Sequence, residues 1–165
     1  MRAEVAWRAG DYAAVAACCH AVLATIADTR ARWWHSLRAQ VKARLAMTVL
    51  RQGDTAASAA LLGEALDAAA AWWEHPALAA VLDACAAYLA DPAAAGEPRR
   101  AATLLGAAHV IRGAFDESSL DAPQARDTLR AVLSPDEFRA AYDSARGVGY
   151  QPAIALAREA LAATA

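Results

Sequence analysis

The stretch GDTAASAALLGEALDAAA, residues 53–70, places a Gly-Asp pair directly before a long run rich in alanine and leucine. A glycine that follows a helix can adopt a positive φ and so end that helix as its C-terminal cap. Asp54 can then cap the next helix, because its carboxylate accepts backbone N–H groups and meets the positive end of the helix dipole. Leu62, Leu66 and Ala69 recur at the spacing of one helix face. The stretch therefore predicts a tight turn between two antiparallel helices, the second of which has an apolar inner face.

The same turn recurs at a fixed interval of 43 residues, since GDYAA begins at Gly10, GDTAA at Gly53 and GEPRRAA at Gly96. The match continues beyond the glycines. The aligned residues are Cys18-Cys19-His20, Leu61-Leu62-Gly63 and Leu104-Leu105-Gly106, followed by Val22, Ala65 and Ala108. Such a period is typical of stacked helical hairpins, in which each unit buries its apolar face against its neighbour.

The composition indicates one all-helical domain that spans residues 1–165. The chain is 58% hydrophobic and 21% charged. Alanine, leucine and arginine, which are strong helix formers, are abundant, and β-branched residues are sparse. The net charge is −2 and the basic residues do not form a basic stripe, so we expect no direct nucleic-acid binding by this chain.

The sequence carries no signal for a membrane. No run of 18 apolar residues is free of charge, as a membrane-spanning helix would require. The first residues include Glu4 and Arg8 and lack the apolar core of a signal peptide. We expect a cytoplasmic protein. Its three cysteines, Cys18, Cys19 and Cys85, are odd in number and are predicted to be reduced thiols, mostly in the core.

Further helices are expected on both sides of the Gly53 turn. Upstream, an apolar series advances in steps of four along one helix face: Trp33, Leu37, Val41, Leu45 and Val49. Downstream, Trp73 continues the inner face of the Gly53 helix, and His75-Pro76 ends that helix. Helices at 77–90 and 99–113 follow, with a loop at 91–98 between them. The residues expected to face inward in the later helix are Leu104, Leu105, Ala108 and Ile111.

Three shorter helices are predicted at about 121–165, outside the 43-residue register. Asp121 is expected to cap a helix that runs to Val132. Ser134, Pro135 and Glu137 form the pattern of a capping box, so a second helix begins there and runs to about Arg146. The last helix is expected at about 152–163. These helices are predicted to cover the open end of the stack.

A helical hairpin that repeats around a Gly-Asp turn resembles the tetratricopeptide repeat (TPR). Ala101, Leu105 and Ala108 fit the consensus of its second helix, although the period here is 43 residues rather than 34. The resemblance implies an all-α, TPR-like stack that winds into a right-handed superhelix with a C-terminal helical cap.

The second half of the chain, from His75 to Ala157, is also similar to the C-terminal helical-repeat region of actinobacterial transcriptional regulators of the SARP and LuxR types that contain an ATPase module. The resembling residues are Ala101-Ala102, Leu104-Leu105-Gly106-Ala107-Ala108, Arg112-Gly113, Leu129, Phe138, Ala141-Tyr142 and Gly147. In that family the DNA-binding and nucleotide-binding modules lie elsewhere in the polypeptide. This chain has no GxxxxGK[ST] phosphate loop.

The resemblance implies a non-catalytic interaction or sensor module that binds a peptide, another domain of the same regulator or an effector. The alternative is a free-standing helical-repeat adaptor that forms a homodimer through an exposed hydrophobic face. We expect neither a catalytic residue nor a cofactor nor a metal. Cys18, Cys19 and His20 point about 100° apart around a helix and cannot converge on one ion, and the four histidines fall on different helices.

A partner surface is the remaining candidate site. Neighbouring indoles on one helix cannot face the same way, so Trp33 and Trp73 are assigned to packing, while Trp34 and Trp72 either pack at the edge of the core or contact a ligand. Arg99 and Arg100 form a small basic patch at a helix start. The candidate surface residues are Trp34, Arg38, Trp72, His75, Arg99 and Arg100.

Overall fold

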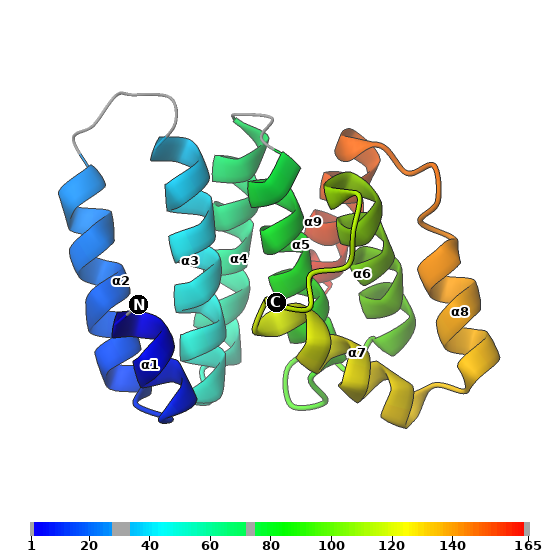
Figure 1. The fold of residues 1–165 in the computed structure, drawn as a ribbon, viewed down its shortest axis with the longest axis horizontal. Helices are drawn as coiled ribbons and strands as arrows, with labels where there is room; N and C mark the ends of the chain where they lie inside the picture. Colours follow the sequence, from blue (N-terminus) through cyan, green and yellow to red (C-terminus); the bar gives the residue numbers. More distant parts are fainter. Residues whose placement is uncertain (1, 28–33, 72–74, 164–165) are drawn as a thin grey trace.

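The computed structural model describes residues 2–27, 34–71 and 75–163 and builds this part of the chain from nine α-helices, without a β-strand. Figure 1 shows α2 to α6 standing side by side, with α8 at the far end of the row and α7 crossing below α5 and α6. The helices are α1 (Arg2–Arg8), α2 (Tyr12–Ile26), α3 (Trp34–Arg51), α4 (Thr55–Ala70), α5 (His75–Ala90), α6 (Pro98–Arg112), α7 (Asp121–Val132), α8 (Pro135–Asp143) and α9 (Tyr150–Ala162). The all-helical fold predicted from the sequence is thereby confirmed.

The helices pack both on their neighbours in the chain and on the next helix but one. From α1 to α8 each helix contacts its successor, and α3 also packs on α5, α5 on α7 and α6 on α8. The last helix, α9, returns to contact α4, α5 and α6 (Figure 1). The helices therefore form a row of antiparallel hairpins, and α9 packs across α4, α5 and α6.

The first two Gly-Asp turns have the same geometry. Gly10 and Gly53 adopt φ of 73° and 91°, which favours glycine. Asp11 accepts a hydrogen bond from the backbone N of Ala14 at 3.0 Å, as Asp54 does from Ala57 at 2.9 Å. The predicted turns and caps are therefore confirmed at both places.

The third turn differs from the first two. Gly96 also has a positive φ, of 61°, but Glu97 makes no side-chain capping bond and Pro98 occupies the first turn of α6. The backbone N of Glu97 instead donates to the carbonyl of Leu89 at 2.9 Å, which closes a longer loop. The expectation that each acidic residue caps the following helix is wrong here. The Glu97 carboxylate instead pairs with Arg100 at 3.0 Å.

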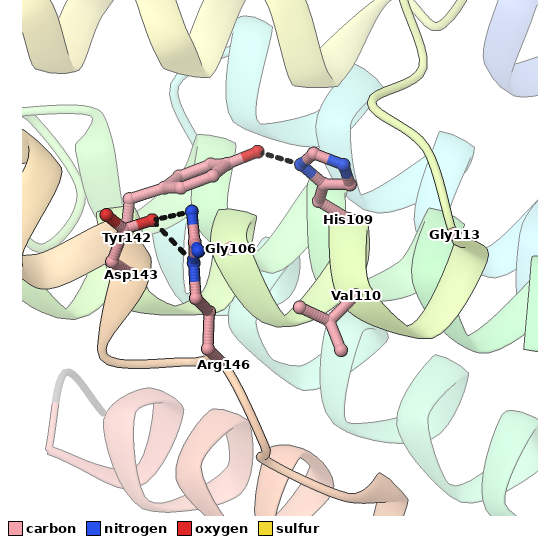
Figure 2. Close-up of a pocket in the computed structure, with 7 residues that line it drawn as sticks. All are labelled: Gly106, His109, Val110, Gly113, Tyr142, Asp143 and Arg146. Atoms are coloured by element: carbon pink, nitrogen blue, oxygen red, sulfur yellow. Dashed lines mark hydrogen bonds and ion pairs between the residues drawn. The ribbon is translucent and has the colours of Figure 1, made fainter.

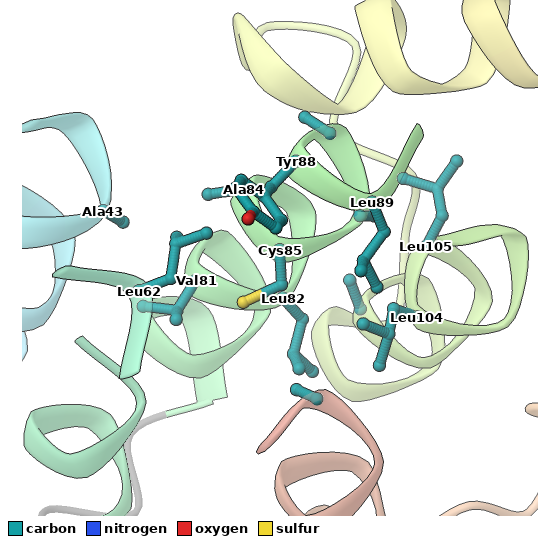
Figure 3. Close-up of a cluster of buried hydrophobic side chains, with 14 of the residues drawn as sticks. Ala43, Leu62, Val81, Leu82, Ala84, Cys85, Tyr88, Leu89, Leu104 and Leu105 are labelled. Carbon is teal, nitrogen blue, oxygen red and sulfur yellow. The ribbon is translucent and has the colours of Figure 1, made fainter. Parts of the chain in front are cut away.

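The core is centred on α5, in which every residue from Val81 to Ala90 is buried. Five helices contact α5, namely α3, α4, α6, α7 and α9, so it has no exposed side over most of its length. Figure 3 shows Val81 of α5 beside Leu62 of α4, and Leu89 of α5 beside Leu104 of α6. The residues predicted to face inward in α4 and α6 are buried: Leu62, Leu66, Ala69, Leu104, Leu105, Ala108 and Ile111.

The face predicted for α3 does not supply the main core. Leu37, Val41 and Val49 are only half-buried, and Val41 and Val49 join a small cluster with α2 around Val15 and Leu45. The main core instead takes residues from the other side of α3, namely Ala39, Ala43, Ala46, Met47 and Leu50. The prediction followed the four-residue spacing from Trp33, whereas α3 turns its other side, which is rich in alanine, toward the core around α5. Trp33 and Trp73 lie outside the described residues.

The C-terminal helices begin close to where they were predicted, but α8 ends at Asp143 and not at Arg146, and one cap was wrongly assigned. Asp121 is not a cap: its side chain is buried and pairs with Arg44 of α3 at 3.2 Å. Ser119 caps α7 instead, since its hydroxyl accepts the backbone N–H groups of Asp121 and Ala122, both at 3.1 Å. Among the described helices, none combines the length and apolarity that a membrane crossing requires.

Candidate interaction surface on α7 and α8

A capping box fixes the start of α8, as its sequence predicts. The Ser134 hydroxyl accepts from the backbone N of Glu137 at 3.3 Å, and the Glu137 carboxylate accepts from the backbone N of Ser134 at 3.1 Å. Arg99, at the start of α6, also donates to Glu137 at 2.6 Å. The hydrogen bonds from Ser134 and Arg99 lower the pKa of Glu137 to about 2. This exposed carboxylate therefore serves to attach α8 to α6.

Two aromatic side chains share one face of α8. Phe138 and Tyr142 are four residues apart, so they lie one turn from each other on the helix. Their rings are stacked with centroids 5.5 Å apart. The guanidinium of Arg130, from α7, lies 5.6 Å from the centre of the Phe138 ring, within the range of a cation–π contact.

These side chains line a groove of about 470 Å³ between α7 and α8. The residues that line it are Arg130, Leu133, Pro135, Phe138, Arg139 and Tyr142. The floor is apolar, two arginines stand at the side, and the lining contains no carboxylate. The groove is therefore suited to an apolar side chain that has a negative charge next to it.

A smaller pocket of about 230 Å³ lies on the other side of Tyr142, between α6 and α8. Figure 2 shows its two polar contacts. The Tyr142 hydroxyl lies 2.5 Å from Nδ1 of His109, and Arg146 pairs with Asp143 at 3.0 Å. Burial raises the pKa of Tyr142. Since these polar groups already bind one another, this pocket offers fewer unsatisfied groups than the groove does.

Gly106 allows α8 to approach α6 closely. A Cβ atom on Gly106 would lie 2.2 Å from the carbonyl oxygen of Tyr142 and 3.2 Å from the Cβ of Ala145. Thr103, three residues earlier on α6, donates to the carbonyl of Ala141 at 3.1 Å. The two helices therefore meet along backbone, which sets the position of Phe138 and Tyr142.

The described residues contain no group of three side chains that could hold a metal ion. Burial raises the pKa of the Cys85 thiol to about 12 and also raises that of Cys19. Both thiols are protonated at neutral pH and so are weak nucleophiles.

The structure does not bring the candidate surface residues named from the sequence into one site. Trp34 is a half-buried residue at the start of α3. Arg38 donates to the carbonyl of Ile26 at 3.0 Å and so satisfies the C-terminal end of α2. The Nε2 atom of His75 lies 2.6 Å from the Tyr150 hydroxyl, a contact that joins the starts of α5 and α9. Trp72 lies outside the described residues.

Arg99 and Arg100 lie next to the α7–α8 groove but are paired with carboxylates. Arg99 binds Glu137, and Arg100 binds Glu97 at 3.0 Å. A shallow depression of about 410 Å³ beside them is lined by Leu133, which also lines the groove. Analysis of the sequence did not select Arg130, Phe138 or Tyr142 as surface residues, although the four-residue spacing of the two aromatics was a visible signal.

Comparisons of the chain with protein-family models, with curated proteins and with solved structures each returned no match.

Proposed function

We propose that this chain is a non-catalytic protein-interaction module that binds a partner segment in the α7–α8 groove. The observation that carries the proposal is the groove itself, in which Phe138 and Tyr142 form an aromatic floor beside Arg130. Within the described part of the chain, Arg130 has a cation–π contact but forms no ion pair. A ligand carboxylate can pair with this guanidinium without displacing a carboxylate of the protein. The expected ligand is a short segment with one large apolar residue next to an acidic one.

The sequence resemblance suggests where such a partner would be found. In that setting the module acts in the cytoplasm of an actinobacterium, and its partner is another domain of the same transcriptional regulator. Occupation of the groove would change how the DNA-binding part is presented. The ion pairs support a role other than direct nucleic-acid binding, because they neutralise many of the basic side chains. The basic residues in ion pairs are Arg8, Lys42, Arg44, Arg99, Arg100, Arg112, Arg126, Arg139, Arg146 and Arg158.

The proposal includes a TPR-like, right-handed superhelical arrangement of the hairpins. It is supported by the 43-residue period, by the equal turns at Gly10 and Gly53, and by the packing of α3 on α5 and of α5 on α7. A crystal structure tests the arrangement directly, through the sense of rotation that relates the α3–α4 hairpin to the α5–α6 hairpin.

Binding in the groove is tested with two synthetic peptides, acetyl-Asp-Leu-Leu-Glu-amide and its uncharged counterpart acetyl-Asn-Leu-Leu-Gln-amide. We expect the acidic peptide to shift the NMR signals of Leu133, Phe138 and Tyr142, with weaker binding by the uncharged one. Arg130→Gln should reduce the affinity for the acidic peptide about tenfold, because the charge-assisted hydrogen bond is lost. Arg158→Gln, on α9, is the matched control and should leave binding unchanged. Equal binding of both peptides, or shifts confined to other helices, would contradict the proposal.

A further inference from the structure

Tyr142 is a wall shared by two cavities. It lines the groove between α7 and α8 and also the smaller pocket between α6 and α8. Figure 2 shows its hydroxyl reaching toward α6, where it lies 2.5 Å from Nδ1 of His109. His109 lines the pocket and is not one of the residues that line the groove. The ring that forms part of the groove floor is therefore held from the pocket side.

Helix α6 holds Tyr142 at both of its ends. Its carbonyl oxygen lies so close to Gly106 that a Cβ atom there would be only 2.2 Å away. His109 follows Gly106 by three residues, so both lie on the same face of α6. The backbone of Tyr142 is thus fixed at Gly106 and its hydroxyl is fixed at His109.

The rest of α8 offers little else that could fix this ring. No residue of α8 is buried, and α8 packs mainly on α6 and only weakly on α7. A half-exposed aromatic side chain can choose among staggered χ1 rotamers. The hydrogen bond to His109 selects the rotamer of Tyr142 that places the ring along the groove.

Phe138 depends in turn on Tyr142. The planes of the two rings are 28° apart and their centroids are separated by 5.5 Å. The guanidinium of Arg130 lies 5.6 Å from the centre of the Phe138 ring. A chain of contacts therefore runs from His109 through Tyr142 and Phe138 to the arginine that the partner's carboxylate would meet.

The Tyr142 hydroxyl has the right protonation state to donate. Burial raises the pKa of Tyr142, so the hydroxyl keeps its proton at neutral pH and can donate to Nδ1 of a neutral imidazole. The charged groups that act on Tyr142 are Asp83, Arg112, Arg126 and Asp143. Each of them is already in an ion pair, with Arg112, Asp83, Glu117 and Arg146, respectively. The hydrogen bond to the histidine thus joins two groups that these ion pairs leave to each other.

We infer that His109 is a positioning residue for the groove: by holding the Tyr142 hydroxyl, it fixes the Phe138–Tyr142 pair in the arrangement that receives the partner's apolar side chain. This inference rests on the proposed function of the groove. A floor that is ordered before the partner arrives does not have to be immobilised on binding, so affinity is gained. His109 acts in this way without touching the partner.

The dissociation constant of acetyl-Asp-Leu-Leu-Glu-amide, from NMR titration of variants, tests the inference. His109→Phe removes the acceptor but keeps an aromatic ring, and it should weaken binding about three- to tenfold. Tyr142→Phe removes only the hydroxyl and should give the same loss. The double variant should lose no more than either single variant, because both remove one interaction.

Two further variants separate positioning from general stability. His109→Asn keeps an acceptor near the place of Nδ1 and should restore most of the affinity that His109→Phe loses. Val110→Ala, at an exposed residue that lines the same pocket, is the matched control and should leave binding unchanged. Circular dichroism checks that each variant is folded. Equal losses for His109→Asn and His109→Phe would overturn the inference, as would losses that add in the double variant.

The chain without peptide gives a second measurement. His109→Phe should shift the NMR signals of the Phe138 ring protons, because the neighbouring Tyr142 ring is released, and His109→Asn should shift them less. If His109→Phe left both these signals and the affinity unchanged while Arg130→Gln weakened binding, the inference would fail and the proposed function would stand. If the acidic peptide shifted no groove signal of the native chain, the proposed function itself would fail.

Discussion

At the scale of single residues, the described core contains two acidic side chains, and each one is paired with an arginine from another helix. Asp83 of α5 binds Arg112 of α6, and Asp121 of α7 binds Arg44 of α3. Burial raises the pKa of Asp83 to about 7, although Arg112 opposes the rise. Removing two charges from water costs about as much as their attraction returns. These pairs therefore determine how the helices are aligned more than they stabilise the fold.

The pKa of Asp83 makes stability depend on pH. Since this pKa is about 7 in the folded chain and 3.8 ordinarily, the contribution of Asp83 is complete below pH about 4 and is lost as the pH rises to about 7. Asp83→Asn cannot titrate, so its free energy of unfolding should rise relative to that of the native chain over this window, by at most about 1.4 kcal/mol per pH unit. Urea unfolding at several pH values measures the difference. Asp127→Asn, at an exposed position, is the control. If the free energies of unfolding of Asp83→Asn and the native chain changed in parallel with pH, Asp83 would have the same pKa in the folded and unfolded chains.

At the scale of helices, the repeat supplies two equivalent glycines in different surroundings. Gly63 of α4 and Gly106 of α6 are separated by one 43-residue period. A Cβ atom on Gly63 would meet nothing within 4 Å, whereas one on Gly106 would overlap the backbone of α8. The same residue type is thus dispensable in one repeat and required in the next, because only α6 has a helix packed on that side.

Alanine at these two positions should have opposite effects. Gly63→Ala should raise the free energy of unfolding by about 0.5–1 kcal/mol, since alanine loses less backbone entropy in a helix. Gly106→Ala should lower it by about 2 kcal/mol, because α8 has to move away from α6. Urea denaturation of both variants provides the measurement. The close approach of α8 would be disproved by an equal gain in stability for the two variants.

At the scale of the whole molecule, α9 distinguishes this chain from a simple row of hairpins. In a simple row each unit contacts only its neighbours, so its parts open separately. Here α9 buries Ile154 and Leu161 and packs on α4, α5 and α6 together. Those helices should therefore unfold as one unit, whereas α2 has helix contacts only with α1 and α3 among the described helices.

Hydrogen exchange measures whether α4, α5 and α6 open together and separately from α2. Amides in α4, α5 and α6 should share the highest protection, and those of α2 should exchange through a lower-energy opening. Ile154→Ala should cost about 2–4 kcal/mol and lower the protection of α4 to α6 together. The exchange of α2 should be unchanged. If Ile154→Ala lowered the protection of α9 alone, the stability of α4, α5 and α6 would not depend on their packing against α9.

Much of the fold could be predicted from the sequence, because its signals are local. Helix propensity, glycine at positive φ, and the Asp11, Asp54 and Ser134 caps act within a few residues of the chain. The inner faces of α4 and α6 follow from helical periodicity alone. Each of these features depends on neighbours in the sequence, so periodicity and spacing are sufficient to identify it.

The candidate sites depend on contacts between distant parts of the chain. Asp121 has the sequence context of a cap, yet its position against Arg44, 77 residues away, makes it a buried ion pair. The groove at Phe138 exists because α8 packs on α6 across Gly106, and no local pattern indicates which glycine meets another helix. The helices follow from short-range chemistry, whereas the surfaces follow from which helix lies against which.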